Sequence, residues 1–552
     1  MQKHKWIVFA IVFVWLSQTI GCAYPSTPPD AVVEKPRIYI DGHEYSHDFV
    51  KVTSDGVYVS STFLRDIAYM ELFCDEQEGI VVFTSLERVV YIGLEDALPQ
   101  DLIWKDAVAY IPLHTLELLY KGRVMWHSES RILHMERPLF RSKPWTLPQN
   151  NSLRCYPDKK ATVRKKIQKD QHVFILRILG SWFNVRTNQG NVGWVEVNTL
   201  DTKDFVHHEF YPPPFVEEPE KNPAEKICMT WQYVYRTTPD PNELYVVEEL
   251  NVIAPTWLYL KNSEGDLADK GRIDYVDWAH SHQYQVWIAC TNSFDPSMTQ
   301  EVLQSTRKRK KVIDRLCQII VDYGAEGVNI DWENIYVKDK DFFTQFMREL
   351  YPIFKQKGLV VSVDITTISE SENWSLCYDR PAIGKTTDFV VLMAYDQYWA
   401  GGDESGSVAE YEWVKQGVEE LVELVPSQKV ILGIPFYSRL WIEDESMQPK
   451  SVSSESYFMD YAMELAEIHA AQWDETIRQY VAQWRDRSHI YTLWVEDPRS
   501  IEHKVQLVHT HGLAGVAFWR KGYEIPEVWP RIGTQLQDVT DSLEPNNKEN
   551  ET

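Results

Sequence analysis

The chain has 552 residues, which is too long for one ordinary domain, so two to four domains are expected. Its hydrophobic content of 44% supports packed cores, whereas its formal net charge of -25 argues against sequence-independent nucleic-acid binding and against adhesion to anionic membrane surfaces. The chain contains 21 Trp and 29 Tyr. These side chains either fill cores and interfaces or offer flat stacking surfaces to sugar rings.

The N-terminus has the pattern of a secretory signal. Two lysines precede the apolar run Trp6–Leu16, which is too short for a comfortable membrane span. Residues 1–22 are therefore predicted to be a signal peptide, and the protein is predicted to be exported. The run Ile20-Gly21-Cys22 resembles a bacterial lipobox, which implies that Cys22 is lipidated and anchors the chain to a membrane. Thr19 stands where Leu is usual, so ordinary cleavage nearby is the alternative.

The remaining cysteines are scattered and form no Cys-x-x-Cys pair, so no zinc or other metal site is expected. A dense disulfide scaffold is not expected either, and buried free thiols are the default. These cysteines are Cys74, Cys155, Cys228, Cys290, Cys317 and Cys377.

A Pro/Ser-rich tether, residues 23–36, leads into an internal repeat. A shift of 52 residues places Tyr58-Val59 on Tyr110-Ile111 and Ile80-Val81 on Ile132-Leu133 without a gap. This repetition predicts duplicated strand–helix–strand units, a small α+β domain over residues 37–138. The segment resembles the stalk module called the copper amine oxidase N-terminal-like domain. No metal is inferred despite that name, because no His/Cys cluster accompanies it.

Residues 148–205 are predicted to form an all-β domain of short strands broken by turns. The pattern around Trp182 and Trp194 resembles a bacterial SH3-like domain, which implies contact with cell-wall peptides. The two tryptophans are either core and rim residues or ligand contacts. A Pro/Glu-rich linker, residues 206–224, follows. The predicted strands are His172–Leu179, Trp182–Arg186 and Gly193–Val197.

From residue 225 the pattern changes to alternating strands and helices. The strands are near-continuously apolar and β-branched, which suits a parallel sheet covered by helices. Eight such units predict a catalytic α/β TIM (β/α)8 barrel over residues 225–535, with active residues at the carboxyl ends of the strands. The acidic tail, residues 536–552, is predicted to be disordered. The candidate strands are Ile227–Val234, Val252–Tyr259, Gln285–Ala289, Gly327–Glu333, Leu359–Ile365, Phe389–Ala394, Lys429–Pro435 and Gly515–Trp519.

The fourth candidate strand, Gly327–Glu333, alternates polar and apolar residues. One face carries Asn329, Asp331 and Glu333, because successive side chains of a strand point to opposite faces. The two carboxyls lie roughly 7 Å apart along the strand, and this proximity raises the pKa of the more enclosed one. A protonated carboxyl beside an ionised one is the arrangement that glycoside hydrolysis uses. The alternative is a half-buried edge strand with a solvated acidic face.

The run Glu326–Glu333 resembles the signature of glycoside hydrolase family 18, the chitinase-like enzymes, written Asp-Gly-x-Asp-x-Asp-x-Glu. The last Asp and the Glu match as Asp331 and Glu333. Two positions depart, since Glu326 and Asn329 stand where the signature has Asp. Asn at this position is familiar in the bacterial spore-and-wall branch of the family. The resemblance covers roughly residues 225–535, a little over half of the chain.

Four further runs resemble motifs of the same family, in the right order and at plausible barrel spacing. Each alone has an ordinary structural explanation, such as a turn or a core tryptophan. Ser438 replaces a usual Gly, and Arg520 replaces a usual apolar residue. The last of the four is interpreted as structural. They are Met393–Asp396, Gly433–Trp441, Gly515–Trp519 and Trp494–Asp497.

The resemblance implies roles for five residues of these runs. Tyr395 hydrogen bonds the N-acetyl oxygen of the substrate, and Asp396 contacts sugar hydroxyls. Tyr437 and Arg439 are pocket residues. Trp519 lies under the sugar at the cleavage point.

The resemblance also implies substrate-assisted hydrolysis, an exception to the two-carboxylate scheme. Glu333 donates a proton to the glycosidic oxygen, and the acetamido oxygen of the substrate attacks the anomeric carbon. Asp331 orients the acetamide and stabilises the positive oxazolinium ion, with help from Tyr395. Asn329, on the same strand face, is counted among the substrate-binding residues. The mechanism requires a 2-acetamido sugar and neither a cofactor nor a metal.

The leading hypothesis is an exported bacterial N-acetylglucosaminidase that cleaves cell-wall glycan, spore-wall glycan or chitin-like oligomers. Its partners are an N-acetylated glycan, the cell wall through the SH3-like domain, and a membrane if Cys22 is lipidated. The runner-up is a non-catalytic glycan-binding or wall-anchoring protein on the same barrel. A third hypothesis places the main task in the N-terminal half, during sporulation or envelope assembly.

Overall fold

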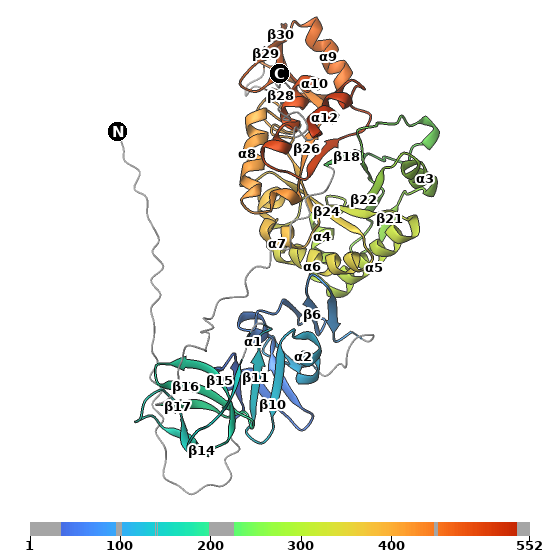
Figure 1. Ribbon diagram of the computed structural model, residues 1–552. Coiled ribbons are helices and arrows are strands. Elements are labelled where there is room, and N and C mark those ends of the chain that lie inside the picture. The colour runs from blue at the N-terminus through green and yellow to red at the C-terminus, as the bar shows by residue number, and fades with distance from the viewer. Residues whose placement is uncertain are drawn as a thin grey trace, which may run out of the picture. The chain divides into compact units, whose positions relative to one another are not determined.

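The computed structural model describes residues 35–94, 102–138, 140, 142–197, 226–446 and 451–537. The predicted signal peptide 1–22 with Cys22, nearly all of the tether 23–36, the linker 206–224 and nearly all of the tail 536–552 lie outside the described residues. The chain forms two compact units (Figure 1). One comprises Met1–Asp48, Met125–Glu136 and Arg141–Leu200, and the other comprises Phe49–Val124, Arg137–Phe140 and Asp201–Thr552.

The first unit is built from strands. Strand β1 (Arg37–Ile40) pairs in parallel with β11 (Ile132–Glu136) and antiparallel with β2 (His43–Tyr45). A six-stranded antiparallel sheet has the order β12-β15-β16-β17-β13-β14. Its strands are β12 (Lys143–Thr146), β13 (Asn151–Arg154), β14 (Val163–Ile167), β15 (His172–Leu179), β16 (Trp182–Thr187) and β17 (Val192–Glu196).

The two tryptophans of this sheet differ in burial. Trp194 is buried and the Arg177 guanidinium lies 5.0 Å above its ring, whereas Trp182 is half-buried. The burial of Trp194 favours its role in the core. The likeness of this segment to bacterial SH3-like domains stays a prediction.

The residues matched by the 52-residue shift lie in equivalent elements. Tyr58-Val59 belong to β4 (Val57–Ser60) and Tyr110-Ile111 to β9 (Val108–Pro112), and these two strands pair with each other. Each is followed by a helix and then by a pair of strands. The elements are β3 (Val50–Val52), α1 (Ser61–Asp66), β5 (Leu72–Asp75), β6 (Ile80–Thr84) and β7 (Val89–Ile92), then β8 (Ile103–Lys105), α2 (Leu113–Leu119) and β10 (Arg123–His127) before β11.

The C-terminal half contains a closed barrel of eight parallel strands, as the sequence predicts. Neighbouring strands pair in the order β19-β18-β32-β26-β25-β24-β23-β22, and the pairing of β19 with β22 closes the ring. The strands are β18 (Ile227–Gln232), β19 (Val252–Pro255), β22 (Gln285–Thr291), β23 (Gly327–Asp331), β24 (Val360–Thr366), β25 (Phe389–Met393), β26 (Val430–Pro435) and β32 (Gly515–Trp519).

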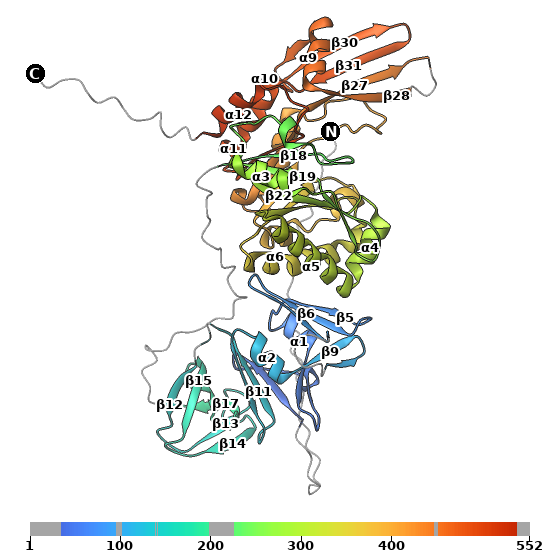
Figure 2. The ribbon, with the colours of Figure 1, turned by 90° about the vertical axis from the view of Figure 1, so that its right-hand side faces the viewer.

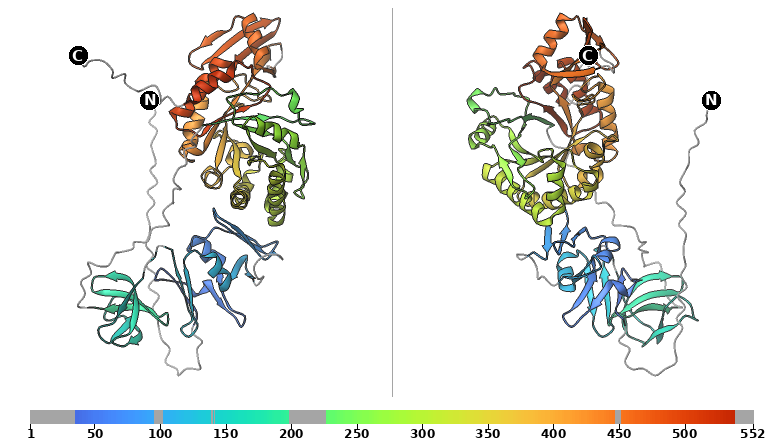
Figure 3. Two further views of the ribbon diagram at one scale, coloured as in Figure 1. Left: turned by 45° about the vertical axis from the view of Figure 1, so that its right-hand side comes forward. Right: turned by 180° about the vertical axis from the view of Figure 1, so that it is seen from behind.

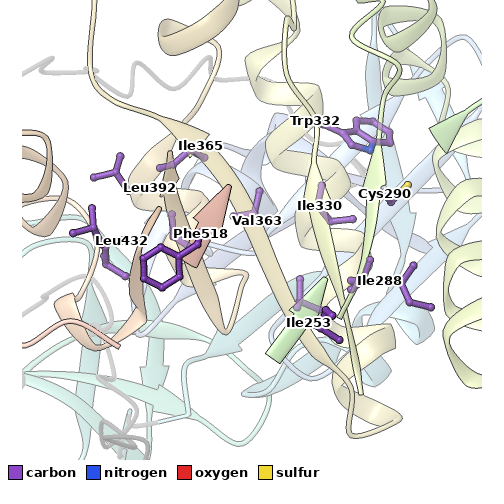
Figure 4. Close-up of a cluster of buried hydrophobic side chains, with 14 of the residues drawn as sticks. Ile253, Ile288, Cys290, Ile330, Trp332, Val363, Ile365, Leu392, Leu432 and Phe518 are labelled. Atoms are coloured by element: carbon purple, nitrogen blue, oxygen red, sulfur yellow. The ribbon is translucent and has the colours of Figure 1, made fainter. Parts of the chain in front are cut away.

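Helices form an outer layer around these strands (Figure 3). Outward-facing strand residues such as Ile330, Val363 and Leu432 pack with helix residues in one large cluster (Figure 4). Met229, Trp231 and other residues belong to a separate cluster inside the barrel. The covering helices are α3 (Ile273–Ser281), α4 (Pro296–Gln304), α5 (Thr306–Tyr323), α6 (Lys340–Gln356), α7 (Arg380–Lys385), α8 (Tyr411–Val422), α10 (Pro498–Val505), α11 (Leu507–Thr510) and α12 (Val528–Leu536).

A five-stranded antiparallel sheet with one helix is inserted between the last two barrel strands (Figure 2). The sequence did not predict this sheet. The run Gly433–Trp441, which resembles a motif of the family, spans the end of β26 and the start of β27. The inserted elements are β27 (Tyr437–Asp444), β28 (Ser451–Phe458), α9 (Met459–Ile468), β29 (Gln472–Asp474), β30 (Gln479–Asp486) and β31 (His489–Val495).

The three-stranded sheet β5–β6–β7 packs against barrel helices within the second unit. Asp75 accepts hydrogen bonds from the backbone N–H and the hydroxyl of Thr306 at the start of α5, at 3.2 and 2.7 Å. Tyr91 donates to Glu349 of α6 at 3.3 Å. The segment before the predicted linker therefore contacts the barrel directly. Among the helices of the described residues, none is both long and apolar enough to cross a membrane.

Candidate active site

Strand β23 directs its two kinds of side chain to opposite sides of the barrel wall. Ile330 and Trp332 are fully buried on the helix side, and the Trp332 ring stacks on Phe346 of α6 at 4.5 Å. Asn329 and Asp331 therefore face the barrel interior. The sequence-based prediction of one polar and one apolar face thus agrees with the burial pattern.

The end of β23 is fixed by hydrogen bonds from two polar side chains that the sequence did not reveal. The buried Asn292 side chain accepts from the Glu333 backbone N–H at 3.1 Å and donates to the Glu333 carbonyl oxygen at 2.6 Å. Tyr378 donates to the Trp332 carbonyl oxygen at 2.9 Å. These contacts lock the backbone on both sides of the Glu333 carboxyl, which limits the positions that it can reach.

Three carboxyls, those of Asp331, Glu333 and Asp364, lie together in the barrel interior. Burial raises the pKa of Asp331 to about 7, and a hydrogen bond with Glu333 lowers it in part. Burial and the negative charges of Asp331 and Asp364 raise the pKa of Glu333 well above its usual range. Burial and the charge of Asp331 do the same for Asp364. Glu333 therefore keeps its proton at neutral pH, as a proton donor must.

Asn329 is held on every polar atom. Its amide oxygen accepts from the Trp231 indole N–H at 2.9 Å. Its amide nitrogen donates to the Ser362 hydroxyl at 3.1 Å and to an Asp364 carboxyl oxygen at 2.6 Å. Because the indole N–H can only donate, this contact fixes which way the amide points. Asn329 is thus a rigid link between β18, β23 and β24.

A second cluster of polar side chains lies beyond the ends of β25 and β26. The Tyr437 hydroxyl donates to an Asp396 carboxyl oxygen at 2.6 Å, and Arg439 donates to the same oxygen at 3.0 Å. The Arg439 side chain is 5% exposed and that of Asp396 is 46% exposed. Burial and nearby negative charges, including those of Asp364 and Glu333, raise the pKa of Tyr395 well above its usual range. Tyr395 is therefore a neutral hydroxyl beside the carboxyl cluster.

Trp519 ends β32 and is half-buried. Its ring centroid lies 5.8 Å from that of Trp231 and 6.2 Å from that of Tyr233. Since Trp231 also donates a hydrogen bond to Asn329, this aromatic cluster lies next to the polar residues of β23. Its partial exposure distinguishes Trp519 from the fully buried Trp332.

The structure places Asp331, Glu333, Tyr395, Asp396 and Trp519 at or just beyond the carboxyl ends of barrel strands, Asn329 in the middle of β23, and Tyr437 and Arg439 at the start of the inserted strand β27, while their roles stay predictions. The sequence missed Asp364, Asn292, Trp231 and Tyr378. Asp364 carried a detectable signal, because it is a lone charge within the otherwise uncharged strand β24. The described residues contain no group of three His, Cys, Asp or Glu side chains arranged to hold a metal ion.

Comparison with known proteins assigns this geometry to a class. Residues 258–524 match the family model described as glycosyl hydrolases family 18. The glycosylase YvbX of Bacillus subtilis (strain 168) is 26% identical over 326 residues, which cover 56% of this chain and 92% of YvbX. The cortical fragment-lytic enzyme of the same organism is 24% identical over 254 residues, covering 45% of this chain and 58% of that enzyme.

A solved structure shares the fold. The C-terminal domain of a putative chitinase from Desulfitobacterium hafniense DCB-2 superposes with a TM-score of 0.51 at 21% identity, covering 57% of this chain and all of that domain. The closed barrel and the family match define the protein as a glycosidase. Over residues 258–524 the barrel is similar to the glycosyl hydrolases of family 18.

Proposed function

We propose that this protein hydrolyses β-linked glycans that contain N-acetylglucosamine, by a substrate-assisted reaction that retains the anomeric configuration. The observation that carries the proposal is the pair Glu333 and Asp331, in which burial and negative charge keep the more accessible carboxyl protonated. The glycosidase class is common to this barrel and its relatives.

The reaction begins with proton transfer from Glu333 to the glycosidic oxygen, and the bond to the anomeric carbon breaks. The acetamido oxygen of the same sugar attacks that carbon and forms an oxazolinium ion. The ionised Asp331 orients the acetamide N–H and stabilises the positive charge, and the neutral Tyr395 hydroxyl donates to the acetamide. Glu333, now ionised, takes a proton from water, which opens the ring with net retention.

The remaining polar residues position the sugar. Asp396 has one oxygen held by Tyr437 and Arg439, which leaves its other oxygen for sugar hydroxyls. Trp519 offers a partly exposed indole face to the sugar ring. These contacts act on any 2-acetamido sugar, so they define the substrate class and not the length of the glycan.

The cell wall is the proposed location of the substrate. A relative is named as a cortical fragment-lytic enzyme, and the predicted signal peptide implies export. The predicted SH3-like segment supplies a second wall contact, and lipidation of Cys22 would retain the protein at the membrane. The non-catalytic alternative is disfavoured because both carboxyls of the pair are present, with Asp331 buried and Glu333 half-buried.

The test is to incubate the purified protein with peptidoglycan sacculi and, separately, with N-acetylglucosamine oligomers, and to identify the products by mass spectrometry. We expect muropeptides cleaved on the reducing side of N-acetylglucosamine, and slower cleavage of the oligomers. Glu333→Gln is the control and should form product at least about 10²-fold more slowly. Absence of cleavage of both substrates by the wild-type protein would contradict the proposal.

A further inference from the structure

Asp364 occupies a place that the family signature does not assign. It lies on β24, the strand next to β23, and is 1% exposed. Ile330 pairs with Val363 across the two strands, so Asp331 and Asp364 are the next residues on each. Parallel neighbours at the same level share a face, so both carboxyls point into the barrel.

The hydrogen bonds of this group leave two oxygens without a donor. One Asp364 oxygen accepts from Asn329, and its other oxygen has no partner among the described atoms. One oxygen of Asp331 is equally buried and without a partner. A buried acceptor without a donor is costly, so a proton between the two carboxyls satisfies both oxygens at once.

The amide at position 329 fixes the orientation of the Asp364 carboxyl, while burial keeps the proton on Asp364. Asn329 donates to Asp364 and cannot reverse, because Trp231 donates to its oxygen. An Asp at position 329 would instead compete with Asp331 for the single proton of Asp364, and its negative charge would lie near that of Asp331 in a buried site. The departure of Asn329 from the family signature and the acid at position 364 therefore belong together.

We propose that Asp364 is a positioning residue of the reaction, which donates a hydrogen bond to Asp331 from the neighbouring strand and is itself oriented by Asn329. The proposal rests on the proposed function. Asp331 must present one oxygen to the acetamide, and the hydrogen bond from Asp364 fixes its other oxygen. The proton stays on Asp364 throughout, so Asp331 keeps its negative charge when the oxazolinium ion forms.

The first test compares Asp364→Leu with Asp364→Asn on N-acetylglucosamine tetramer. Leu removes the donor, and misplacement of a reacting group by about 1 Å can cost about 10²-fold, so kcat should fall by about that factor with little change in KM. Asn keeps an N–H for Asp331 and an oxygen for Asn329, so it should stay within about 10-fold of wild type. Ser362→Ala is the control, because it removes another partner of Asn329, together with a hydrogen bond to the Val328 carbonyl oxygen, and leaves Asp364 in place.

Wild-type kcat in Asp364→Leu would overturn the proposal, and so would an Asp364→Asn variant as slow as Asp364→Leu. If the wild-type protein cleaves no glycan, the proposed function is wrong.

A measurement of stability against pH, which needs no catalysis, then tests the hydrogen bond between Asp364 and Asp331. Loss of the donor raises the pKa of Asp331 further, so the stability of Asp364→Leu should fall more steeply from pH 5 to pH 8 than that of Asp364→Asn. Glu333 and Tyr395 are the other titratable groups that face this pair. Equal slopes would overturn the pairing.

A second pair of variants tests the link between positions 329 and 364. Asn329→Asp restores the signature residue, yet it should lower the melting temperature at pH 8, because it sets carboxyl against carboxyl. Adding Asp364→Asn returns an amide to the pair and should recover the loss. If Asn329→Asp is as stable as wild type at pH 8, or if the second change recovers nothing, the two positions are independent and the proposal is wrong.

Discussion

Two regions of the barrel domain bury acidic side chains, and they treat the charge in opposite ways. Glu349 on α6 is fully buried and accepts from Arg309 at 2.8 and 3.1 Å and from Gln345 at 2.9 Å. At the strand ends, Asp331 and Asp364 are buried with no Lys or Arg among their described hydrogen-bond partners. A buried carboxyl that is paired with a cation is part of the scaffold. A carboxyl that is buried without a cation has a raised pKa, which allows it to hold or transfer a proton in a reaction.

The largest expected effect comes from the proton donor. Glu333→Gln should lower kcat/KM by about 10² to 10⁴-fold, because the amide keeps the shape but delivers no proton. Its melting temperature should stay close to that of wild type. Glu349→Gln should do the converse, with unchanged kcat/KM and lower stability, because Arg309 loses its counter-ion. Equal loss of activity in the two variants would remove the distinction between the regions.

Substitutions in the buried ion pair Arg309–Glu349 should act mainly on the stability of the fold. Arg309→Met leaves Glu349 buried without a cation, and breaking a buried pair in this way costs about 3–5 kcal/mol. Lys311→Met is the matched control. Its ammonium lies 2.6 Å from an Asp266 carboxyl oxygen, but both side chains are half exposed, and such pairs contribute about 0–1 kcal/mol to stability. Urea unfolding of both variants measures the difference, and similar losses would show that burial of the pair does not matter.

Two tryptophans extend the comparison to apolar side chains. Trp332→Ala should cost about 3–5 kcal/mol of stability, because Trp332 is fully buried against Phe346. Trp519→Ala should mainly weaken binding of N-acetylglucosamine oligomers, because its ring is partly exposed. Calorimetry of binding and thermal melting separate the two effects. A Trp519→Ala variant that melts early but binds normally would assign Trp519 to the core.

The last expected effect is the pH dependence of stability. The folded-state pKa of Asp331, about 7, lies above its unfolded value of about 3.9, so the folded state holds the extra proton between these values. Stability is therefore lost as pH rises from about 4 to 7, by a few kcal/mol. Asp331→Asn should gain stability relative to wild type over this window. A constant difference from pH 4 to pH 8 would contradict the pKa assignment.

The sequence predicted the barrel well because each strand is a short apolar run, and these runs alternate with helical segments along the chain. It predicted Asp331 and Glu333 because alternation places them on one face. The inserted sheet was missed, since the Gly433–Trp441 motif continues unbroken from β26 into β27. Asp364 was missed because its importance depends on the pairing of β24 with β23, a contact between residues over thirty positions apart.

The repeat shows a second limit of sequence reasoning. The 52-residue shift identified equivalent elements, such as β4 and β9, from residue identity alone. It could not reveal that Asp75 and Tyr91 bond to α5 and α6 of the barrel. Such contacts depend on surface complementarity between distant segments, which has no periodic signal in the chain.

The most direct test of the central claim is the anomeric form of the first product. Proton NMR during cleavage of N-acetylglucosamine oligomers in D₂O should show the β-anomer first, followed by mutarotation. Oligomers with a free amine in place of the acetamide at the cleavage point should stay intact, because the attacking oxygen is absent. Initial appearance of the α-anomer, or cleavage of the deacetylated oligomer at a similar rate, would contradict substrate-assisted retention at Glu333 and Asp331.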